Sequence, residues 1–432
     1  MVAHLVHRCH DQMASLGLDN LGHVPFLLGM EMSYLDEANR FLRLRSSGTW
    51  SLSKREATAY SRSNPLSANT VLSYANDLKN FWSYLEARQI DWRNLEFQQL
   101  LDTYDRDMMA GRWRSRGSRG LAASTINRRM RTALEFLLWA ADQRLREPFH
   151  IAQSKSYGRR ISRNSWASPR TEMDRRVGMH RIDPKRCRLP SSDEITSWLS
   201  EVRNAHGRAR YLAIKFILQT GCRLEEVANA RVVQLPDPAS IDLDMPARMD
   251  IVFGTKGQRV PGDAELKGKP RSLRFNRSFA VELNNYRQLG RRKSLAIFKN
   301  KNPTSSSPIQ IFLDEKTGKP LSKQSIYRAW NKTRPHPIPG WSPHLGRHAF
   351  ACFLLLRLVN EENSLLSAMA ETMPRSQIIV QLENLISVFI RPVMGHVDDR
   401  TTEGYIEWIA DHLWVAEHRR EWTNYLEEGC DQ

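Results

Sequence analysis

Apolar side chains recur every three or four residues in two segments of this chain, and this spacing restricts the fold more than any other feature. The apolar positions are Val71, Tyr74, Leu78, Phe81, Trp82 and Leu85 in the first segment, and Ile126, Met130, Leu134, Leu137 and Leu138 in the second. Residues with this spacing lie on one face of an α-helix. A further helix is predicted from Leu95 to Met109, ending at Gly111. Residues 66–148 are therefore predicted to form a helical domain, with Ser124 capping its last helix.

The other face of that last helix carries polar side chains. Asn127, Arg128 and Arg131 lie on it, and a basic loop with Arg114 and Arg116 precedes it. A helix that is apolar on one face and rich in Arg and Asn on the other suits docking on DNA phosphates and base edges. A basic face that is merely solvated has the same composition, so these residues alone leave both interpretations open.

The charge of the whole chain favours a polyanionic partner. Lys and Arg number 64 against 47 Asp and Glu, which gives a net charge of +17. An excess of this size points first to nucleic acid. The five cysteines are scattered without CxxC spacing, which indicates a reducing compartment and neither a disulfide framework nor a zinc site. No apolar run has membrane-spanning length and the N-terminus does not resemble a signal peptide, so we expect a cytoplasmic protein without membrane contact.

Two segments flank the helical domain. Residues 1–65 are expected to be a helical leader of unknown role, because apolar residues from Phe26 to Arg45 have helical spacing. Residues 149–188 are rich in Ser, Arg and Gly with little periodicity, and we interpret them as a basic linker. The repeated arginines of this linker would follow a phosphate backbone well.

A second domain is predicted over residues 189–432. It opens with Ser191 and Glu194 at capping-box spacing, ahead of a helix at 208–219. A strand is predicted at 250–254, followed by a turn at 255–259 and a return strand, with a third strand at 272–275 and a similar segment at 309–313. Helices are predicted at 322–330 and 349–359. Residues 360–391 are expected to be a helical insertion. The expected fold class is mainly α with a small β-sheet.

This second domain contains cationic pairs at helical spacing. Arg223 and Glu226 are three residues apart, so the carboxylate can hold the guanidinium in place. His344 and Arg347 share the first turn of a helix, where backbone N–H groups also favour an anion. Lys256 stands at the predicted tip of a hairpin.

A histidine and a tyrosine close the series. On an unbroken helix His396 and Tyr405, nine residues apart, would lie on opposite faces. The Asp and Thr residues at 398–402 favour a break and a new helix, which would let both side chains reach one site. Taken alone, Tyr405 is better explained as part of an apolar stripe of a C-terminal helix, together with Trp408, because periodic aromatic residues usually belong to a core.

Together these side chains form a coherent set for phosphoryl transfer. Arginine forks match the non-bridging oxygens of a phosphodiester and would stabilise its transition state. Tyr405 would be the nucleophile, His344 is placed to accept its proton, and Lys256 to protonate the departing 5′ oxygen. His396 would hydrogen-bond the phosphate. Because we find no carboxylate cluster that would hold Mg²⁺, the site is interpreted as free of metal and other cofactors.

In this order the motifs resemble those of the tyrosine recombinase (phage-type integrase) family. The segments that carry the resemblance are Thr220-Gly221-Cys222-Arg223-Leu224-Glu225-Glu226, Thr255-Lys256-Gly257, His344-Leu345-Gly346-Arg347-His348, and Gly395-His396 with Tyr405. The resemblance implies a SAM-like core-binding domain and an α+β catalytic domain that clamp duplex DNA at a specific core site. It also implies a site-specific recombinase that acts through a 3′-phosphotyrosine without ATP, assembles as a homotetramer at synapsis, and integrates or excises a mobile element.

The chain departs from the family in three places. Gly346 stands where the family usually has leucine, the segment between Arg347 and His396 is longer than in compact members, and Lys267 and Lys269 compete with Lys256 for the role of general acid. Two rivals remain open: a type IB topoisomerase with the same chemistry, and a DNA-binding protein that kept the fold and lost the activity.

Overall fold

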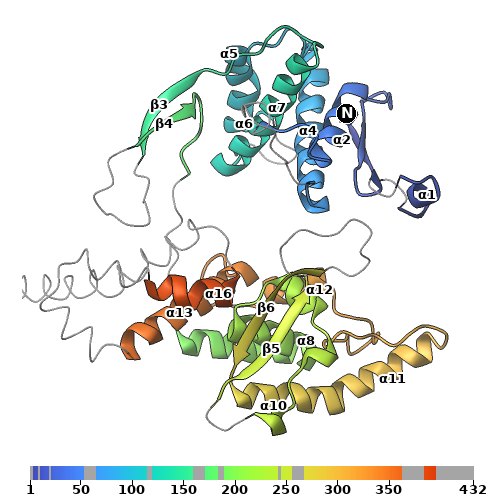
Figure 1. The fold of residues 1–432 in the computed structure, drawn as a ribbon, viewed down its shortest axis with the longest axis vertical. Coiled ribbons are helices and arrows are strands. Elements are labelled where there is room, and N and C mark those ends of the chain that lie inside the picture. The colour runs from blue at the N-terminus through green and yellow to red at the C-terminus, as the bar shows by residue number, and fades with distance from the viewer. Residues whose placement is uncertain are drawn as a thin grey trace, which may run out of the picture. The chain divides into compact units, whose positions relative to one another are not determined.

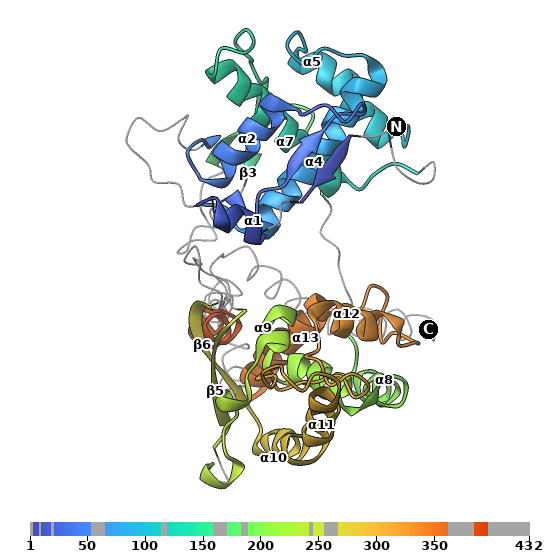
Figure 2. The same ribbon diagram turned by 90° about the vertical axis from the view of Figure 1, so that its right-hand side faces the viewer.

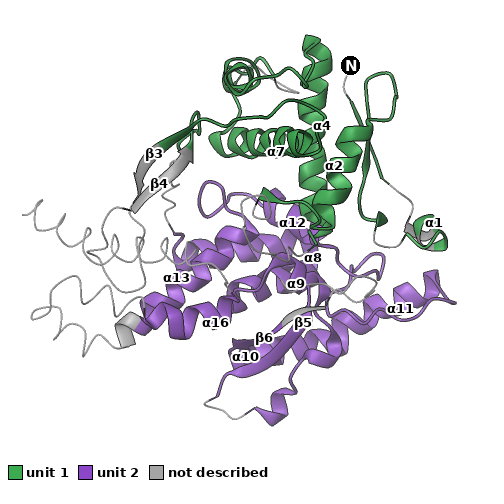
Figure 3. Ribbon diagram, turned by 45° about the horizontal axis from the view of Figure 1, so that its top comes forward, with its two compact units in different colours: residues 1–185 green, residues 186–432 purple. Residues whose placement is uncertain are grey.

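A computed structural model describes most of the chain. The described residues are 3–7, 10–18, 21–52, 65–113, 119–158, 171–182, 189–241, 245–254, 267–361 and 384–395. The chain divides into two compact units, residues 1–185 and 186–432, which Figure 3 distinguishes by colour. Helices dominate the described part of both units, with three two-stranded sheets, so the expected fold class is confirmed.

The predicted helical domain supplies most of the buried core of the first unit (Figure 1). Its main helices are α4 (Ala68–Arg88) and α7 (Ala123–Asp142), which pack against each other. Ser67 caps α4 by accepting a hydrogen bond from the Thr70 N–H. The predicted 95–109 helix is present as α5 (Phe97–Leu100), a π-helical turn (Leu101–Asp105) and α6 (Arg106–Met109). The cap prediction for α7 was wrong by two residues, since the N-cap is Ala122 and Ser124 lies inside the helix.

The leader is part of this unit and is less helical than predicted. Its elements are β1 (His4–Val6), α1 (His10–Ser15), β2 (Phe26–Leu28) and α2 (Asp36–Ser46), with β1 antiparallel to β2. The predicted helix from Phe26 is therefore wrong before Asp36. The Asn39 side chain explains the difference, because its amide bonds both the N–H and the C=O of Leu27 and satisfies a strand backbone. Leu27 and Phe41 are fully buried in the same core as α4 and α7.

The segment predicted as a linker also contains regular structure. Strands β3 (Gln153–Gly158) and β4 (Thr171–Arg176) pair antiparallel, while 159–170 and 183–188 lie outside the described residues. The carboxamide of Asn127 on α7 bonds the main-chain N–H and C=O of His180. The His180 ring also lies 2.7 Å from a carboxylate oxygen of Asp105. These contacts anchor the chain after β4 to the helical domain.

The second unit is built on α8 (Ser192–Thr220). The predicted capping box of Ser191 and Glu194 is present. A kink at Gly207, where φ is +83°, separates the two halves of α8, and the predicted 208–219 helix is the second half. Glu315 accepts a hydrogen bond from the Ala209 N–H at the start of that half. The helix ends at Gly221, whose left-handed conformation (φ +61°) glycine adopts without strain.

A β-hairpin lies along one side of the helices of this unit (Figure 2). Its strands are β5 (Ala247–Phe253) and β6 (Lys267–Phe275). The helices that follow or flank it are α9 (Leu224–Asn229), α10 (Arg277–Asn285), the π-helical turn Tyr286–Gly290, α11 (Arg291–Lys301) and α12 (Lys323–Lys332), with 3-10 turns at Val232–Gln234 and Pro238–Ser240. The strand predicted at 309–313 forms only isolated bridges, Arg231 to Gln310 and Leu313 to Pro320.

The last described elements form a small core of their own. Helix α13 (Pro343–Glu361) packs against a π-helical turn (Ile386–Ile390) that leads into α16 (Arg391–Met394). Buried in this core are Ala351, Cys352, Leu355, Leu385, Ile386, Ile390 and Met394. The described end of the predicted insertion, 384–391, is therefore core structure of this unit. None of the described helices is long and apolar enough to cross a lipid bilayer.

Candidate active site

Arg223 stands at the junction of α8 and α9. After the turn at Gly221 the chain re-enters a helix, and Arg223 is the N-cap of α9. The predicted contact with Glu226 is present twice over, since the Arg223 backbone N–H donates to Oε2 at 2.6 Å and the guanidinium donates to Oε1 at 3.0 Å. The backbone N–H and the guanidinium of Arg223 are thereby both bonded to one carboxylate on the first turn of α9.

Arg347 reaches the same place from α13. Its guanidinium donates to the carbonyl oxygens of Gly221 and Met394. Only 4% of the residue is exposed. Burial, together with the neighbouring charges of Arg223 and Arg271, lowers the pKa of Arg347 to about 10, so the group is still protonated at neutral pH.

Arg271 is a third guanidinium in this cluster and was not among the predicted site residues. Nε donates to Glu226 Oε1 at 3.2 Å, and the two terminal nitrogens donate to Glu226 Oε2 and to the Val393 carbonyl. A signal was present in the sequence: on β6, Arg271 alternates with Leu273 and Phe275, which are buried, so it belongs to the inward face of the strand.

The cluster is held by one buried carboxylate. Glu226 is 1% exposed and accepts hydrogen bonds from both Arg223 and Arg271. Burial opposes its ionisation, but the adjacent Arg271, followed by the Arg223 backbone and guanidinium, holds the pKa of Glu226 below its usual range. The cluster therefore combines three guanidinium groups with one carboxylate and is strongly cationic.

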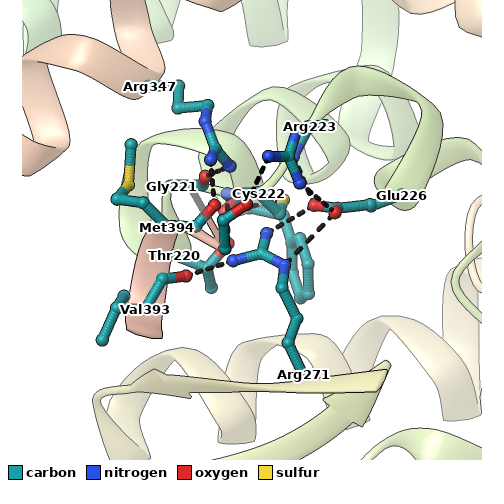
Figure 4. Close-up of polar contacts among 11 residues, drawn as sticks. Thr220, Gly221, Cys222, Arg223, Glu226, Arg271, Arg347, Val393 and Met394 are labelled. Carbon is teal, nitrogen blue, oxygen red and sulfur yellow. Dashed lines mark hydrogen bonds and ion pairs between the residues drawn. The ribbon is translucent and has the colours of Figure 1, made fainter. Parts of the chain in front are cut away.

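The three guanidinium groups bind three consecutive carbonyl oxygens at the end of α16. Arg271 donates to Val393, Arg347 to Met394, and Arg223 to Gly395 at 2.8 Å. Figure 4 shows the three side chains pointing toward one another from α9, β6 and α13. Cationic donors at this position complement the negative end of a helix dipole. The site thus fixes the backbone immediately before His396.

His344 lies on the first turn of α13, as predicted, and is exposed. Its Nε2 is 2.9 Å from Nε2 of His348, one helical turn on. Burial, the adjacent His344 and Arg347 lower the pKa of His348 to about 4, so His348 is neutral at physiological pH. A neutral His348 accepts a hydrogen bond from His344 or donates one to it, according to its tautomer.

The remaining predicted site residues divide into two groups. Lys256, His396, Tyr405, Arg114 and Arg116 lie outside the described residues. Asn127, Arg128 and Arg131 are placed on α7, where each is engaged within the first unit. Arg128 bonds Asp77 at 2.5 Å, and Arg131 bonds Glu135 at 2.8 Å. The side chain of Arg131 is 68% exposed and that of Arg128 48%.

The arrangement in the second unit suits a phosphate. Guanidinium forks match phosphate oxygens, and their orientations are set here by Glu226 and by main-chain carbonyls. Within the described ranges, no three His, Cys, Asp or Glu side chains gather as metal ligands would.

Part of the helical domain matches a known protein family. Residues 58–144 match the family described as phage integrase, N-terminal SAM-like domain. No curated protein matches the sequence.

Solved structures resemble the chain at low sequence identity. The XerH site-specific recombinase bound to difH substrate, in a pre-cleavage complex, has 15% identity over 96% of this chain and 90% of that chain, with a TM-score of 0.46. The Tn1549 transposon integrase in complex with transposon right end DNA has 14% identity over 84% and 94%, with a TM-score of 0.43. A lambda integrase dimer bound to a core site has 10% identity over 79% and 89%, with a TM-score of 0.42.

Proposed function

We propose that this chain, whose residues 58–144 belong to the phage integrase N-terminal SAM-like domain family, is a site-specific DNA recombinase that cleaves and rejoins duplex DNA through a 3′-phosphotyrosine. One observation carries the proposal. Arg223 and Arg347, from separate helices, converge on the backbone at Met394 and Gly395, directly before His396 and the segment that leads to Tyr405. Two arginines held in this way are arranged to bind one phosphodiester.

The arginines act by electrostatic stabilisation. A phosphodiester under attack gains negative charge on its non-bridging oxygens, and fixed guanidinium donors stabilise that charge without rearrangement. Partial burial strengthens each interaction, because water screens it less. Glu226 keeps Arg223 oriented, so its fork is set before DNA arrives.

The proposed chemistry is a reversible transesterification. The Tyr405 phenol oxygen attacks the phosphorus and loses its proton to His344, while the bond to the 5′ oxygen breaks and Lys256 protonates that oxygen. His396 hydrogen-bonds the phosphate. The phosphodiester energy is kept in the phosphotyrosine, so a 5′ hydroxyl can attack it and rejoin DNA without ATP.

The proposed partner is duplex DNA with a specific core site, and the assembly at synapsis is a homotetramer. The net charge of +17 favours a polyanion. Exchange between two duplexes breaks four strands, and each break uses one tyrosine, so four copies of the chain are needed. We propose integration or excision of a mobile element, carried out in the cytoplasm.

A nicked suicide substrate tests the proposal. The expected result is a covalent protein–DNA adduct that maps to Tyr405, with a free 5′ hydroxyl on the other side of the break. Tyr405→Phe should bind the same DNA and form no adduct, and Tyr327→Phe is the matched control. An adduct that persists in Tyr405→Phe would refute the assignment.

Two further assays on the wild-type protein distinguish a recombinase from the two alternative functions. Relaxation of supercoiled DNA that lacks any recombination site would favour a type IB topoisomerase. Tight binding of duplex DNA without any adduct, across a library of candidate sites, would favour a protein that retains the fold and lacks the activity.

A further inference from the structure

We propose that Arg271 is a positioning residue of this site, which orients Arg223 through Glu226 and fixes the backbone that enters the His396 segment. This inference rests on the proposed function. It concerns a side chain that none of the recombinase motifs quoted above includes.

Arg271 is a buried charge on the inward face of a strand. Only 7% of its side chain is exposed, and the residue paired with it on β5 is Ile251, which is also buried. An arginine in such a place is costly unless its donors are satisfied. Every nitrogen of its guanidinium donates to the protein, two to Glu226 and one to Val393. Because all three nitrogens are bonded to protein atoms, Arg271 holds Glu226 and the Val393 carbonyl in place.

Arg271 determines how tightly Glu226 holds Arg223. Glu226 faces Arg223, Arg271 and Cys222, with Arg347 close by. With Arg271 present, the single negative charge is shared between two guanidinium groups. Without it, a buried carboxylate would pair with Arg223 alone and draw its positive charge away from a phosphate.

Arg271 also fixes the main chain at the end of α16. It donates to the Val393 carbonyl, and its side chain lies against Gly395, where an added Cβ would come 3.0 Å from Arg271 Cδ. Gly395 has a φ of +57° and ends α16. The direction in which the chain leaves toward His396 is therefore set partly by Arg271.

The test compares Arg271→Met and Arg271→Lys with Arg274→Met. Arg274 lies three residues further on the same strand and is exposed, so it is a matched control. We expect Arg271→Met to lower the single-turnover cleavage rate of a suicide substrate at saturating DNA by about 10²-fold, the cost of a misplaced catalytic group, with DNA affinity nearly unchanged. Arg271→Lys should recover part of the rate, and Arg274→Met should match the wild type.

A pH profile distinguishes positioning from general support of the fold. Loss of Arg271 should raise the pKa of the buried Glu226 carboxyl, so cleavage by Arg271→Met should decline with acidification before that of the wild type does. Adding Glu226→Gln should abolish this extra pH dependence. An unchanged cleavage rate in Arg271→Met, or a parallel loss of DNA affinity, would overturn the proposal. So would failure of both Arg271 variants to fold, because Arg271 would then serve the fold itself.

Thermal unfolding gives a readout that does not depend on activity. The melting-temperature losses of Arg271→Met and Glu226→Gln should be less than additive in the double variant, because both remove the same contact. Additive losses would mean that the contact is absent. If the wild type forms no adduct on any DNA but the two losses of melting temperature are not additive, the proposed function fails. The contact between Arg271 and Glu226 is then still supported.

Discussion

Gly346 lies against the indole ring of Trp330, so closely that an added Cβ would come 2.5 Å from its Cη2 atom. Trp330 is fully buried and packs on Trp198 and Trp341, with ring centroids 4.9 Å and 5.4 Å away. The contact joins α12 to the first turn of α13, which carries His344 and Arg347. Because this contact leaves no room for a side chain, it explains why position 346 is glycine, where tyrosine recombinases usually have leucine.

We therefore expect Gly346→Ala to destabilise the protein by about 1–3 kcal/mol, the usual cost of overpacking a buried site. Trp330→Phe removes the ring atoms nearest Gly346 and should make the alanine better tolerated. Denaturant unfolding of the two single variants and the double variant measures this coupling. Additive effects would show that the two residues do not compete for space.

Replacing Arg347 should separate DNA binding from cleavage. Because its contacts matter most in the transition state, Arg347→Ala should reduce the cleavage rate by about 10²–10³-fold while DNA affinity changes little. Arg357→Ala, an exposed arginine on the same helix, is the control. Equal losses of binding and cleavage would mean that Arg347 only holds DNA in place.

His348 should make stability depend on pH. Its pKa is lowered from the usual 6.5 to about 4. Between these values the folded protein binds fewer protons than the unfolded chain, so stability should fall as the pH drops from 6.5 toward 4. His348→Gln should reduce this loss, measured as the difference in unfolding midpoint between pH 7 and pH 5. His150→Gln, on an exposed residue, should not.

Arg128 and Arg131 of α7 should behave differently. Arg131 is largely exposed, and its partner Glu135 also has Arg45 at 3.1 Å, so Arg131→Ala should leave stability intact. If α7 contacts DNA, this variant lowers the salt dependence of binding by about one unit of slope. Arg128→Ala should instead destabilise the first unit, because it deprives the buried Asp77 of its closest cation. Filter binding at several salt concentrations, with thermal unfolding, checks both.

Local patterns were enough to predict much of this protein. Apolar periodicity located α4 and α7, since a helical face repeats within a few residues. The capping-box spacing of Ser191 and Glu194 is likewise a local pattern, and both of its hydrogen bonds are present at the start of α8. The contact between Arg223 and Glu226 followed from their spacing on one turn. Each of these features depends on neighbours in the sequence.

Tertiary structure decided what depends on residues distant in the chain. Residues 26–28 form a strand because Asn39 and the partner strand β1 satisfy their backbone. Arg271 lies in the site because β6 packs beside the end of α16. Its guanidinium also stabilises the charge of the buried Glu226 carboxylate. Gly346 was required by Trp330, from another helix. Local sequence patterns determined the longer helices and the motif residues that are chemically able to hold a phosphate. Packing between distant segments determined which of those side chains meet, and it added Arg271 to them.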